Sequence, residues 1–293
     1  MRYALTLVLL AVSCGGPLEE GPDGDDLNGK VRIRLVSGNL STGNNQSWTA
    51  GEGLRILRGL HPDVAMVQEF NYASNSAADI QAFANAVCGA PCHVARESGA
   101  GLQIPNGIVS RYPIKSSGRW VDSTVGNRGF AWARIDIPGS HDLWVVSVHL
   151  LSSSIASRAT EGNELASDIA HAVPAGDYVA IGGDFNTSAR TETVIANLAG
   201  TVVTTAPWPA DASGNANTNF SRAKPYDWVL VNPALQTLQT SVTIGAGRFP
   251  AGLVADTRVY LPIADLSPAR ATDSAASNMQ HMAVVRDFVI ARR

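Results

Sequence analysis

The segment 178–187, with sequence YVAIGGDFNT, joins a short apolar run to two residues able to do chemistry. Val179–Ile181 is typical of a buried strand, and Gly182 and Gly183 allow a sharp turn after it. Asp184 and Asn186 follow, and if strand geometry persists their side chains point to one face. A carboxylate and a carboxamide in one small volume can orient a water, a metal ion or a phosphate. The alternative is an ordinary turn, because Gly, Asp and Asn are common turn residues.

Similar polar side chains terminate other apolar segments of the chain. Asn39, Glu69 and His149 each lie at the end of such a segment. Asp227 lies near the start of another, and His281 comes just before the last one. A single acid at a strand end is more often a cap or a surface charge. Six such positions in one chain favour a common site at the rim of packed sheets.

The elements that would position these residues alternate between strands and helices. Short apolar or alternating runs predict strands at 31–36, 63–69, 106–110, 130–137, 143–150, 179–181, 226–231 and 282–290. Helical spacing of apolar residues predicts helices at 52–60, 77–87 and 155–173. No internal repeat and no linker after Gly29 is evident, so we expect one domain of mixed α and β structure.

The order of several short motifs resembles the endonuclease/exonuclease/phosphatase superfamily. These motifs are SGN, QE, SRYPI, SVHL, GGDFN, YDWVLV and QHMAVV, spread over about residues 31–290. Members include deoxyribonuclease-I-like nucleases, abasic-site endonucleases, neutral sphingomyelinases and inositol-polyphosphate phosphatases. The resemblance implies an α/β fold, a four-layer αββα sandwich of two mixed β-sheets with flanking helices and a site at one rim.

The resemblance also implies a metal ion. Glu69 would be the main carboxylate ligand of Mg²⁺, with Mn²⁺ or Ca²⁺ as alternatives, and Asn39 would help to fix the ion or its waters. The superfamily usually has Asp immediately before the last histidine, whereas this chain has Gln280. An amide oxygen can still face a cation, but it brings no charge. Two interpretations stay open: an active enzyme, which we favour, or a weakened, non-catalytic relative.

The remaining motif positions imply catalytic and phosphate-binding roles. Asp184 would orient or deprotonate the attacking water, and Asn186 would hold the phosphate. His281 would contact the scissile phosphate while Asp227 accepts its other ring N–H, and His149 would be a second phosphate contact. Two further positions match substrate-phosphate ligands of some members, namely Asn106 and Arg128.

The predicted function is therefore a metal-dependent phosphoester hydrolase, a phosphodiesterase or endonuclease that uses direct attack by water. Phospholipid, sphingomyelinase-like or small phosphate-ester hydrolysis is the alternative, because the same centre serves all these substrates. A second alternative is a surface binding module with the same fold and no turnover. A serine hydrolase is excluded by the absence of a G-x-S-x-G motif. The expected partner is a phosphate-ester substrate, nucleic acid included, and no obligatory protein partner is indicated.

Charge does not discriminate between these substrates. The chain has 293 residues, 45% of them hydrophobic and 16% charged, with a formal net charge of −3. The acidic segment 15–29 holds five of the 25 acids, and Arg2 in the leader is one of the 22 bases, which leaves 21 bases against 20 acids. The predicted domain is nearly neutral, so it shows no basic excess that would favour nucleic acid.

The first residues resemble a targeting signal. Arg2 precedes an apolar run too short to span a bilayer, and small residues lead to Cys14. We expect a lipoprotein-type signal at 1–14, an acidic flexible tether at 15–29 and the enzyme domain at 30–293. The protein would then be exported and attached to the cell envelope by a lipid on Cys14. A plain secretory signal, with cleavage nearby and a secreted product, is the alternative.

Two further cysteines, Cys88 and Cys92, lie four positions apart with a predicted turn between them. In an oxidising compartment such a pair is expected to form a small structural disulfide. A redox-active pair remains an alternative. Half of a zinc site is less favoured, because no second cysteine pair completes it.

Overall fold

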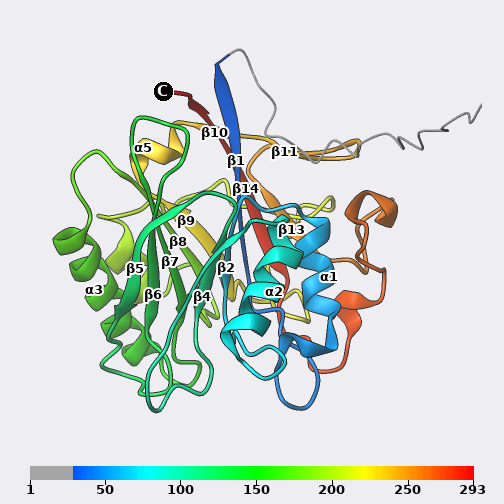
Figure 1. Ribbon diagram of the computed structural model, residues 1–293, viewed down its shortest axis with the longest axis horizontal. Coiled ribbons are helices and arrows are strands. Elements are labelled where there is room, and N and C mark those ends of the chain that lie inside the picture. The colour runs from blue at the N-terminus through cyan, green and yellow to red at the C-terminus, as the bar shows by residue number, and fades with distance from the viewer. Residues whose placement is uncertain (1–28) are drawn as a thin grey trace, which may run out of the picture.

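The computed structural model describes residues 29–293, so the predicted signal and all of the tether except Gly29 lie outside the described residues. Two mixed β-sheets pack face to face, and helices cover the outer face of each (Figure 1). The expected α/β fold, a four-layer αββα sandwich, is confirmed. Within residues 29–293, no helix combines the length and the apolar composition needed to cross a bilayer.

The first sheet has seven strands, with β1 and β14 at its centre. Its spatial order is β10 (Gln239–Thr240), β14 (Ala283–Ala291), β1 (Lys30–Gly38), β2 (Val64–Val67), β4 (Gly107–Ser110) and β3 (His93–Arg96), with β13 (Leu253–Ala255) also paired to β14. β1 pairs with β14 antiparallel over eight residue pairs and with β2 in parallel. The carboxyl ends of β1 and β2 therefore lie at the same edge of the sheet as the beginning of β14.

The second sheet has five strands in sequential order. They are β5 (Ile114–Trp120), β6 (Phe130–Ile135), β7 (Leu143–His149), β8 (Tyr178–Asp184) and β9 (Asp227–Val231). β7 and β8 are parallel, and β9 is antiparallel to β8, with Asp184 opposite Asp227. The ends of β7 and β8 and the start of β9 thus share one edge. A separate hairpin comprises β11 (Val242–Ile244) and β12 (Gly247–Phe249).

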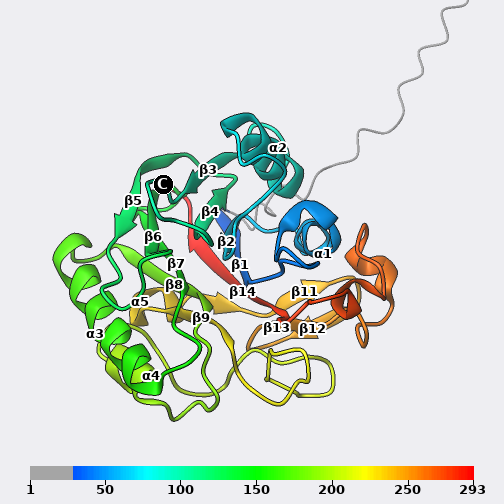
Figure 2. The ribbon, with the colours of Figure 1, turned by 90° about the horizontal axis from the view of Figure 1, so that it is seen from below.

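Helices cover the outer faces of both sheets (Figure 2). α1 (Glu52–Gly59) and α2 (Ala77–Cys88) pack on the first sheet, and α3 (Ile155–Ala172) and α4 (Thr193–Leu198) pack on the second. The short helix α5 (Pro233–Gln236) follows β9. Three single turns complete the helical elements: η1 (Trp48–Ala50), η2 (Ile263–Leu266) and η3 (Asp273–Ala275).

Three apolar clusters hold the layers together. One lies between the two sheets and includes Ile33, Val64, Val145 and Val229, none more than 3% exposed. The others lie beneath the helices on either side. Burial of this apolar surface supplies most of the force that presses the layers together. Gly182 permits the close approach of the sheets, because a Cβ there would lie 2.5 Å from the Met66 sulfur.

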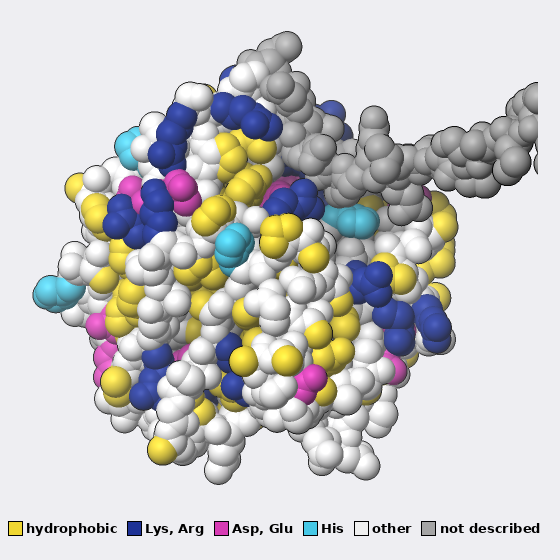
Figure 3. Space-filling view, viewed as in Figure 1, with side chains coloured by type: hydrophobic (Ala, Val, Ile, Leu, Met, Phe, Trp, Pro, Cys, Tyr) yellow, Lys and Arg dark blue, Asp and Glu magenta, His cyan; other side chains and the backbone are white. Residues whose placement is uncertain are grey.

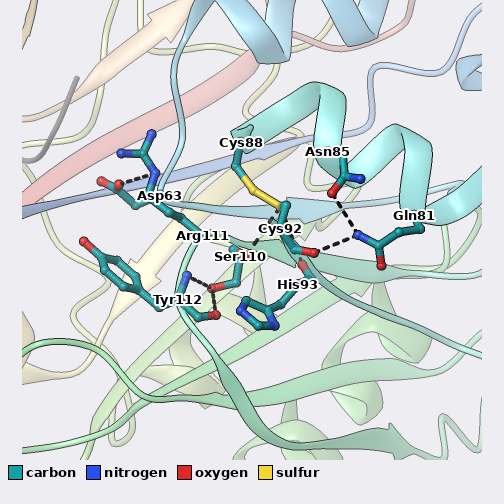
Figure 4. The surroundings of a disulfide bond; sticks show 9 residues. All are labelled: Asp63, Gln81, Asn85, Cys88, Cys92, His93, Ser110, Arg111 and Tyr112. Atoms are coloured by element: carbon teal, nitrogen blue, oxygen red, sulfur yellow. Dashed lines mark hydrogen bonds and ion pairs between the residues drawn. A yellow bond between two sulfur atoms is a disulfide. The ribbon is translucent and has the colours of Figure 1, made fainter. Parts of the chain in front are cut away.

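The predicted disulfide is confirmed: Cys88, the last residue of α2, is bonded to Cys92 (Figure 4). Gln81 of α2 donates a hydrogen bond of 2.7 Å to the carbonyl of Cys92. Cys92 is buried in the cluster beneath α1 and α2. The bond therefore attaches the end of α2 to the start of β3.

Candidate active site

Six polar residues from six strand ends meet where the edges of the two sheets face each other. This edge is the lower one in Figure 1, at the opposite end of β14 from the labelled C-terminus. The first sheet supplies residues after β1, after β2 and before β14: Asn39, Glu69 and His281. The second supplies the last residues of β7 and β8 and the first of β9: His149, Asp184 and Asp227. The edge predicted from the sequence is thus assembled from both sheets.

Asp184 is at the centre of the group. Its Oδ2 atom lies 3.3 Å from Asn39 Nδ2, 3.4 Å from His149 Nε2 and 3.3 Å from His281 Nε2. The side chain is almost completely buried. Burial, opposed by protonated His281 and assisted by the charge of Asp227, raises the pKa of Asp184 to about 6. A carboxylate with this pKa can accept a proton near neutral pH.

Glu69 follows β2 and faces the same space. Asn39 Nδ2 donates to its Oε1 at 3.1 Å, and the Ser41 hydroxyl donates to its Oε2 at 2.5 Å. The backbone of Glu69 has φ 47°, an uncommon left-handed conformation for a residue other than glycine. The prediction that a strand runs through Glu69 was therefore wrong, because β2 ends at Val67. Ser41 was not predicted; its position two residues after Asn39 was the only signal.

His281 is held between two carboxylates. Its Nδ1 lies 3.0 Å from Asp227 Oδ2 and its Nε2 lies on the Asp184 side. Asp227 is itself fixed by its backbone N–H, which donates to the Thr218 hydroxyl at 2.7 Å. Burial disfavours the charged ring, but Asp184 and Asp227 outweigh it and raise the pKa of His281 to about 10. The ring is therefore an imidazolium at neutral pH, with both N–H groups directed at acids.

His149 has the opposite character. Burial, together with the nearby positive charges of Arg128 and His281, lowers its pKa well below the ordinary value. The ring is neutral at pH 7, and its Nδ1 atom has no hydrogen-bond partner among the described residues. The site thus contains one charged and one neutral imidazole, both close to Asp184 Oδ2.

Arg128 is buried directly behind His149. Its Nε donates to the carbonyl of His149 and its Nη2 donates to that of Leu150 at 3.1 Å. These contacts hold the end of β7 in place. Its charge also acts on Glu69 and Asp184, so the guanidinium belongs to the electrostatic environment of the site. Whether it also contacts a substrate phosphate stays a prediction.

Two other predicted residues make structural contacts. Asn186 has φ 53°, so strand geometry does not continue past Asp184 and the expected common face is not formed. Instead, its backbone N–H donates to Asp184 Oδ1 at 2.8 Å and its amide donates to the Leu150 carbonyl at 3.0 Å. Asn106 is fully buried and donates to the Gly129 carbonyl at 2.7 Å. Both contacts orient loops beside the site, and their phosphate-binding roles stay predictions.

Gln280 lies next to His281 but differs from it in environment. Its side chain is exposed, and within residues 29–293 the amide makes no hydrogen bond. Its carbonyl accepts the backbone N–H of Phe220 at 2.8 Å. The predicted role of Gln280 at a metal ion stays a prediction.

The donor atoms present suit a hard divalent cation. Glu69 and Asp184 are carboxylates that both accept from the amide nitrogen of Asn39, while the Asn39 oxygen accepts from the Ser41 hydroxyl. Carboxylate and amide oxygens are the ligands that Mg²⁺ and Ca²⁺ prefer. Asp184, Asp227 and His281 also offer ligand atoms within 4.8 Å of one another, but both nitrogens of His281 already face carboxylates. Glu69 and Asn39 are therefore the better candidates for metal ligands.

Charge supports the same conclusion. Three carboxylates, Glu69, Asp184 and Asp227, stand against two cations, His281 and Arg128, which leaves one net negative charge. An anionic phosphate ester would be repelled by such a centre, and a divalent cation would reverse the sign. The residues present thus fit a bound divalent cation.

Comparisons with known proteins agree with this fold. A sequence model of the endonuclease/exonuclease/phosphatase family matches residues 54–266. No curated protein matches the chain. Solved structures with the same fold include an endonuclease/exonuclease/phosphatase family protein from Bacteroides thetaiotaomicron, with TM-score 0.59 and 12% identity over 89% of this chain and 98% of that one.

Two others carry functional names. Sphingomyelinase C from Streptomyces griseocarneus has TM-score 0.54 and 14% identity over 88% of this chain and 99% of that one. Truncated TDP2 from Caenorhabditis elegans has TM-score 0.53 and 16% identity over 88% and 97%. The chain belongs to the endonuclease/exonuclease/phosphatase family, whose members are generally phosphoester hydrolases that typically depend on a divalent metal.

Proposed function

We propose that this protein is a metal-dependent phosphodiesterase that cleaves its substrate by direct attack of water on phosphorus. The observation that carries the proposal is the arrangement around Asp184, where a buried carboxylate with a raised pKa meets a charged and a neutral imidazole. Groups whose pKa values are driven apart in this way are typical of acid–base catalysis.

Each residue has a role that follows from its charge. Glu69 and Asn39 would hold Mg²⁺, which when bound supplies positive charge to a phosphate oxygen. Asp184, ionised above a pH of about 6, would orient the water and take its proton. His281, held as an imidazolium by Asp227, would donate a hydrogen bond to the phosphate as negative charge develops there. Neutral His149 would add a second hydrogen bond to the phosphate.

A nucleic acid is the first candidate substrate, but the distribution of surface charge does not favour it. Lys and Arg side chains on the face in Figure 3 form several separate groups, some of them beside Asp or Glu, rather than one basic stripe. A nuclease of this kind would bind weakly and lose affinity steeply with salt.

One observation favours a phospholipid as the second candidate. The large hydrophobic side chains that are exposed within residues 29–293 lie on loops, and in one case on the first residue of α3, at the edge that carries the site. They are Val121, Ile155, Phe220, Val259 and Leu261, which is 84% exposed. These loops follow β5, β7 and β13 or precede β9. Exposed apolar side chains around a site are suited to a lipid surface.

The substrate can be identified by one assay panel. The domain 30–293 would be incubated with supercoiled DNA, RNA, sphingomyelin vesicles and inositol phosphates, each with Mg²⁺ and with EDTA. We expect Mg²⁺-dependent release of product from one of these classes and its loss in Glu69→Gln. A Glu69→Gln protein that is folded by circular dichroism but retains full activity at low Mg²⁺ would reject the metal assignment. Turnover of none of the four would favour the binding-module alternative.

We further propose that the protein is exported and anchored by a lipid on Cys14. The Cys88–Cys92 disulfide supports export, because such bonds persist in oxidising compartments. In cell fractionation, the wild type should be found with membranes and Cys14→Ser should not. A wild-type protein without lipid mass on its N-terminal peptide would leave only the secreted alternative.

A further inference from the structure

A surface groove lies between the end of α1 and the disulfide loop that follows α2. Its volume is about 750 Å³, and much of its lining is apolar, including Ala90 and Pro91 of the disulfide loop. Three basic side chains also line it, those of Arg58, His61 and Arg111. The first two are exposed and the side chain of Arg111 is 28% exposed, so all three can meet a ligand. Within residues 29–293 the lining contains no acid.

Positive charge is concentrated in this groove around His61. Burial lowers the pKa of the His61 ring, and four nearby guanidinium groups lower it further, those of Arg34, Arg111, Arg32 and Arg58. Among the described residues, Arg58 has no ion-pair partner. Because these neighbours disfavour a second positive charge on the ring, the electrostatic potential in the groove is positive.

Acids that pair with these arginines neutralise only half of their charge. Asp63 pairs with Arg111 at 3.5 Å (Figure 4). Asp287 pairs with Arg32 at 3.2 Å and with Arg34 at 2.7 Å. Four positive charges therefore stand against two negative ones, which leaves two net positive charges around the groove. A local excess of this kind in a nearly neutral domain is suited to an anionic partner.

The chain itself supplies a segment of matching chemistry. Segment 15–28 precedes the described residues and contains no base and five acids, namely Glu19, Glu20, Asp23, Asp25 and Asp26. It also contains two leucines and two prolines. Acidic and apolar side chains in one short segment match the two parts of the groove lining, the basic residues and the apolar ones.

The segment is also long enough to reach the groove. It ends directly before Gly29, and Arg34 of β1 lies beside Asp63, because the backbone N–H of Arg34 donates to Asp63 Oδ2 at 2.8 Å. Gly29 precedes Arg34 by five residues, which is about 17 Å of strand. Asp23 and Glu19 precede Gly29 by six and ten residues, and extended chains of these lengths span about 21 and 35 Å. Acids in the middle of the segment can therefore reach the arginines.

We propose that segment 15–28 binds in this groove of its own chain, with its carboxylates beside the arginines and its leucine and proline side chains against the apolar lining. Each charge pair is partly exposed and weak, but the segment is covalently attached and so binds at a high effective concentration.

Binding of the segment has a consequence for how the protein is held. Asp63 precedes β2 and Glu69 follows it, so the groove and the candidate site lie toward opposite ends of this strand. A bound segment would keep the proposed lipid on Cys14 near the groove and away from the candidate site. This orientation depends on the proposed lipid, whereas binding of the segment does not.

The first test is an NMR titration of His61 in chain 15–293, which lacks only the predicted signal. The comparison chain carries five neutral substitutions: Glu19→Gln, Glu20→Gln, Asp23→Asn, Asp25→Asn and Asp26→Asn. We expect a higher pKa of His61 in the wild-type chain, because nearby carboxylates favour the imidazolium. The difference should shrink at about 1 M salt, which screens exposed charges. Equal pKa values of His61 in the two chains would overturn the proposal.

The second test measures how accessible the segment is to a protease that cleaves after glutamate, here Glu19 and Glu20. A bound segment is cleaved only when it leaves the groove, so the cleavage rate in mass spectrometry reports binding. Arg58→Gln and Arg111→Gln in chain 15–293 should each raise this rate by about two- to fivefold, since each removes a partly exposed charge. Arg119→Gln, an exposed arginine on β5 of the second sheet, is the matched control and should be cleaved at the wild-type rate.

Three outcomes of the protease test are distinguishable. Faster cleavage in the two groove variants alone would support binding in the groove. Equal rates in the wild type and all three variants would show that the segment does not bind there, and would overturn the proposal. Protection that increases with protein concentration would place the segment of a second copy in the groove and would contradict binding within one chain. Because Arg58 is exposed, its variant provides the test even if Arg111→Gln does not fold. Neither test involves the lipid or turnover, so both are independent of the proposed function.

Discussion

At the scale of single residues, one carboxylate oxygen organises the candidate site. Asp184 Oδ2 is within 3.4 Å of the side chains of Asn39, His149 and His281. Its other oxygen accepts the backbone N–H of Asn186. These contacts fix the position of the carboxylate before substrate arrives. Such preorganisation lowers the reorganisation cost of catalysis.

A first prediction concerns the charge of His281. Asp227→Asn removes one of the two carboxylates that raise the pKa of His281 to about 10, so that pKa should fall. The stability gained from protonation of His281 in the wild type is complete below its ordinary pKa of 6.5 and is lost as pH rises through about 10. The variant should lose it at lower pH. NMR titration of the His281 ring measures its pKa in the wild type and in the variant. An unchanged pKa would reject the assigned role of Asp227.

A second prediction concerns Gln280, where the chain departs from the superfamily pattern. Gln280→Asp adds a negative charge next to His281, and if a cation binds nearby, activity should saturate at lower Mg²⁺. A Mg²⁺ titration of the single variant measures this. No shift together with a lower maximal rate would mean that Gln280 contacts substrate instead. Because the side chain of Gln280 is exposed, the substitution should affect stability less than a substitution in the core would.

Sequence predicted which residues lie together at this edge better than it predicted their local geometry. Six of them lie together because each ends or begins a strand, which apolar runs reveal. The left-handed backbone of Glu69 and Asn186 was not predictable, since it depends on contacts with loops distant in sequence. The carbonyl acceptors of Asn186 and Asn106 likewise come from other loops, at Leu150 and Gly129.

At the scale of elements, largely buried strands were found, and exposed or very short strands were missed. β1, β2, β6, β7 and β9 match the predicted segments to within two residues at each end. β5 was missed because most of its residues are exposed, so it lacks apolar alternation. β10–β13 were missed because they are only two or three residues long. Apolar runs therefore identify the buried strands, the edge strand β9 included, whereas exposed and very short strands depend on tertiary pairing.

The disulfide leads to a prediction for the element that it closes. Cys88→Ser/Cys92→Ser removes the bond that closes a five-residue loop. By restricting the unfolded chain, this bond stabilises the fold by about 2 kcal/mol. The melting temperature should fall by about 4–8 °C while activity is retained, because the bond joins α2 to β3 and not the site strands. Calorimetry and an activity assay check both parts. A loss of activity at full stability would instead indicate a functional, redox-active pair.

The contact between the sheets gives another prediction. Gly182→Ala places a Cβ 2.5 Å from the Met66 sulfur and 3.0 Å from Ser37 Cβ, so the sheets must shift or Met66 must change rotamer. We expect a loss of about 1–3 kcal/mol in the free energy of unfolding. Gly200→Ala is the control, because nothing lies within 4 Å of its Cβ. Equal stability of the two variants in urea would show that the sheets tolerate the added methyl group.

At the scale of the whole molecule, each sheet contributes half of the candidate site. Asn39, Glu69 and His281 come from the first sheet, and His149, Asp184 and Asp227 come from the second. The site therefore exists only when the sheets pack face to face, and the apolar layer between them is what aligns the two halves. The order of the motifs along the chain does not predict this alignment, because it depends on how the two sheets pack.

The central claim is that these six residues form the active site of a metal-dependent phosphoester hydrolase. Its most direct test is the initial rate of phosphodiester hydrolysis by domain 30–293, measured with Mg²⁺, after EDTA and after Mg²⁺ is restored. Asp184→Asn is compared with Asp168→Asn, a change on the outer helix α3. We expect EDTA and Asp184→Asn each to lower the rate by about 100-fold or more. Restored Mg²⁺ should return the EDTA-treated enzyme to its full rate, and Asp168→Asn should hydrolyse at the wild-type rate. A rate unaffected by EDTA, or equal in the two variants, would contradict the account.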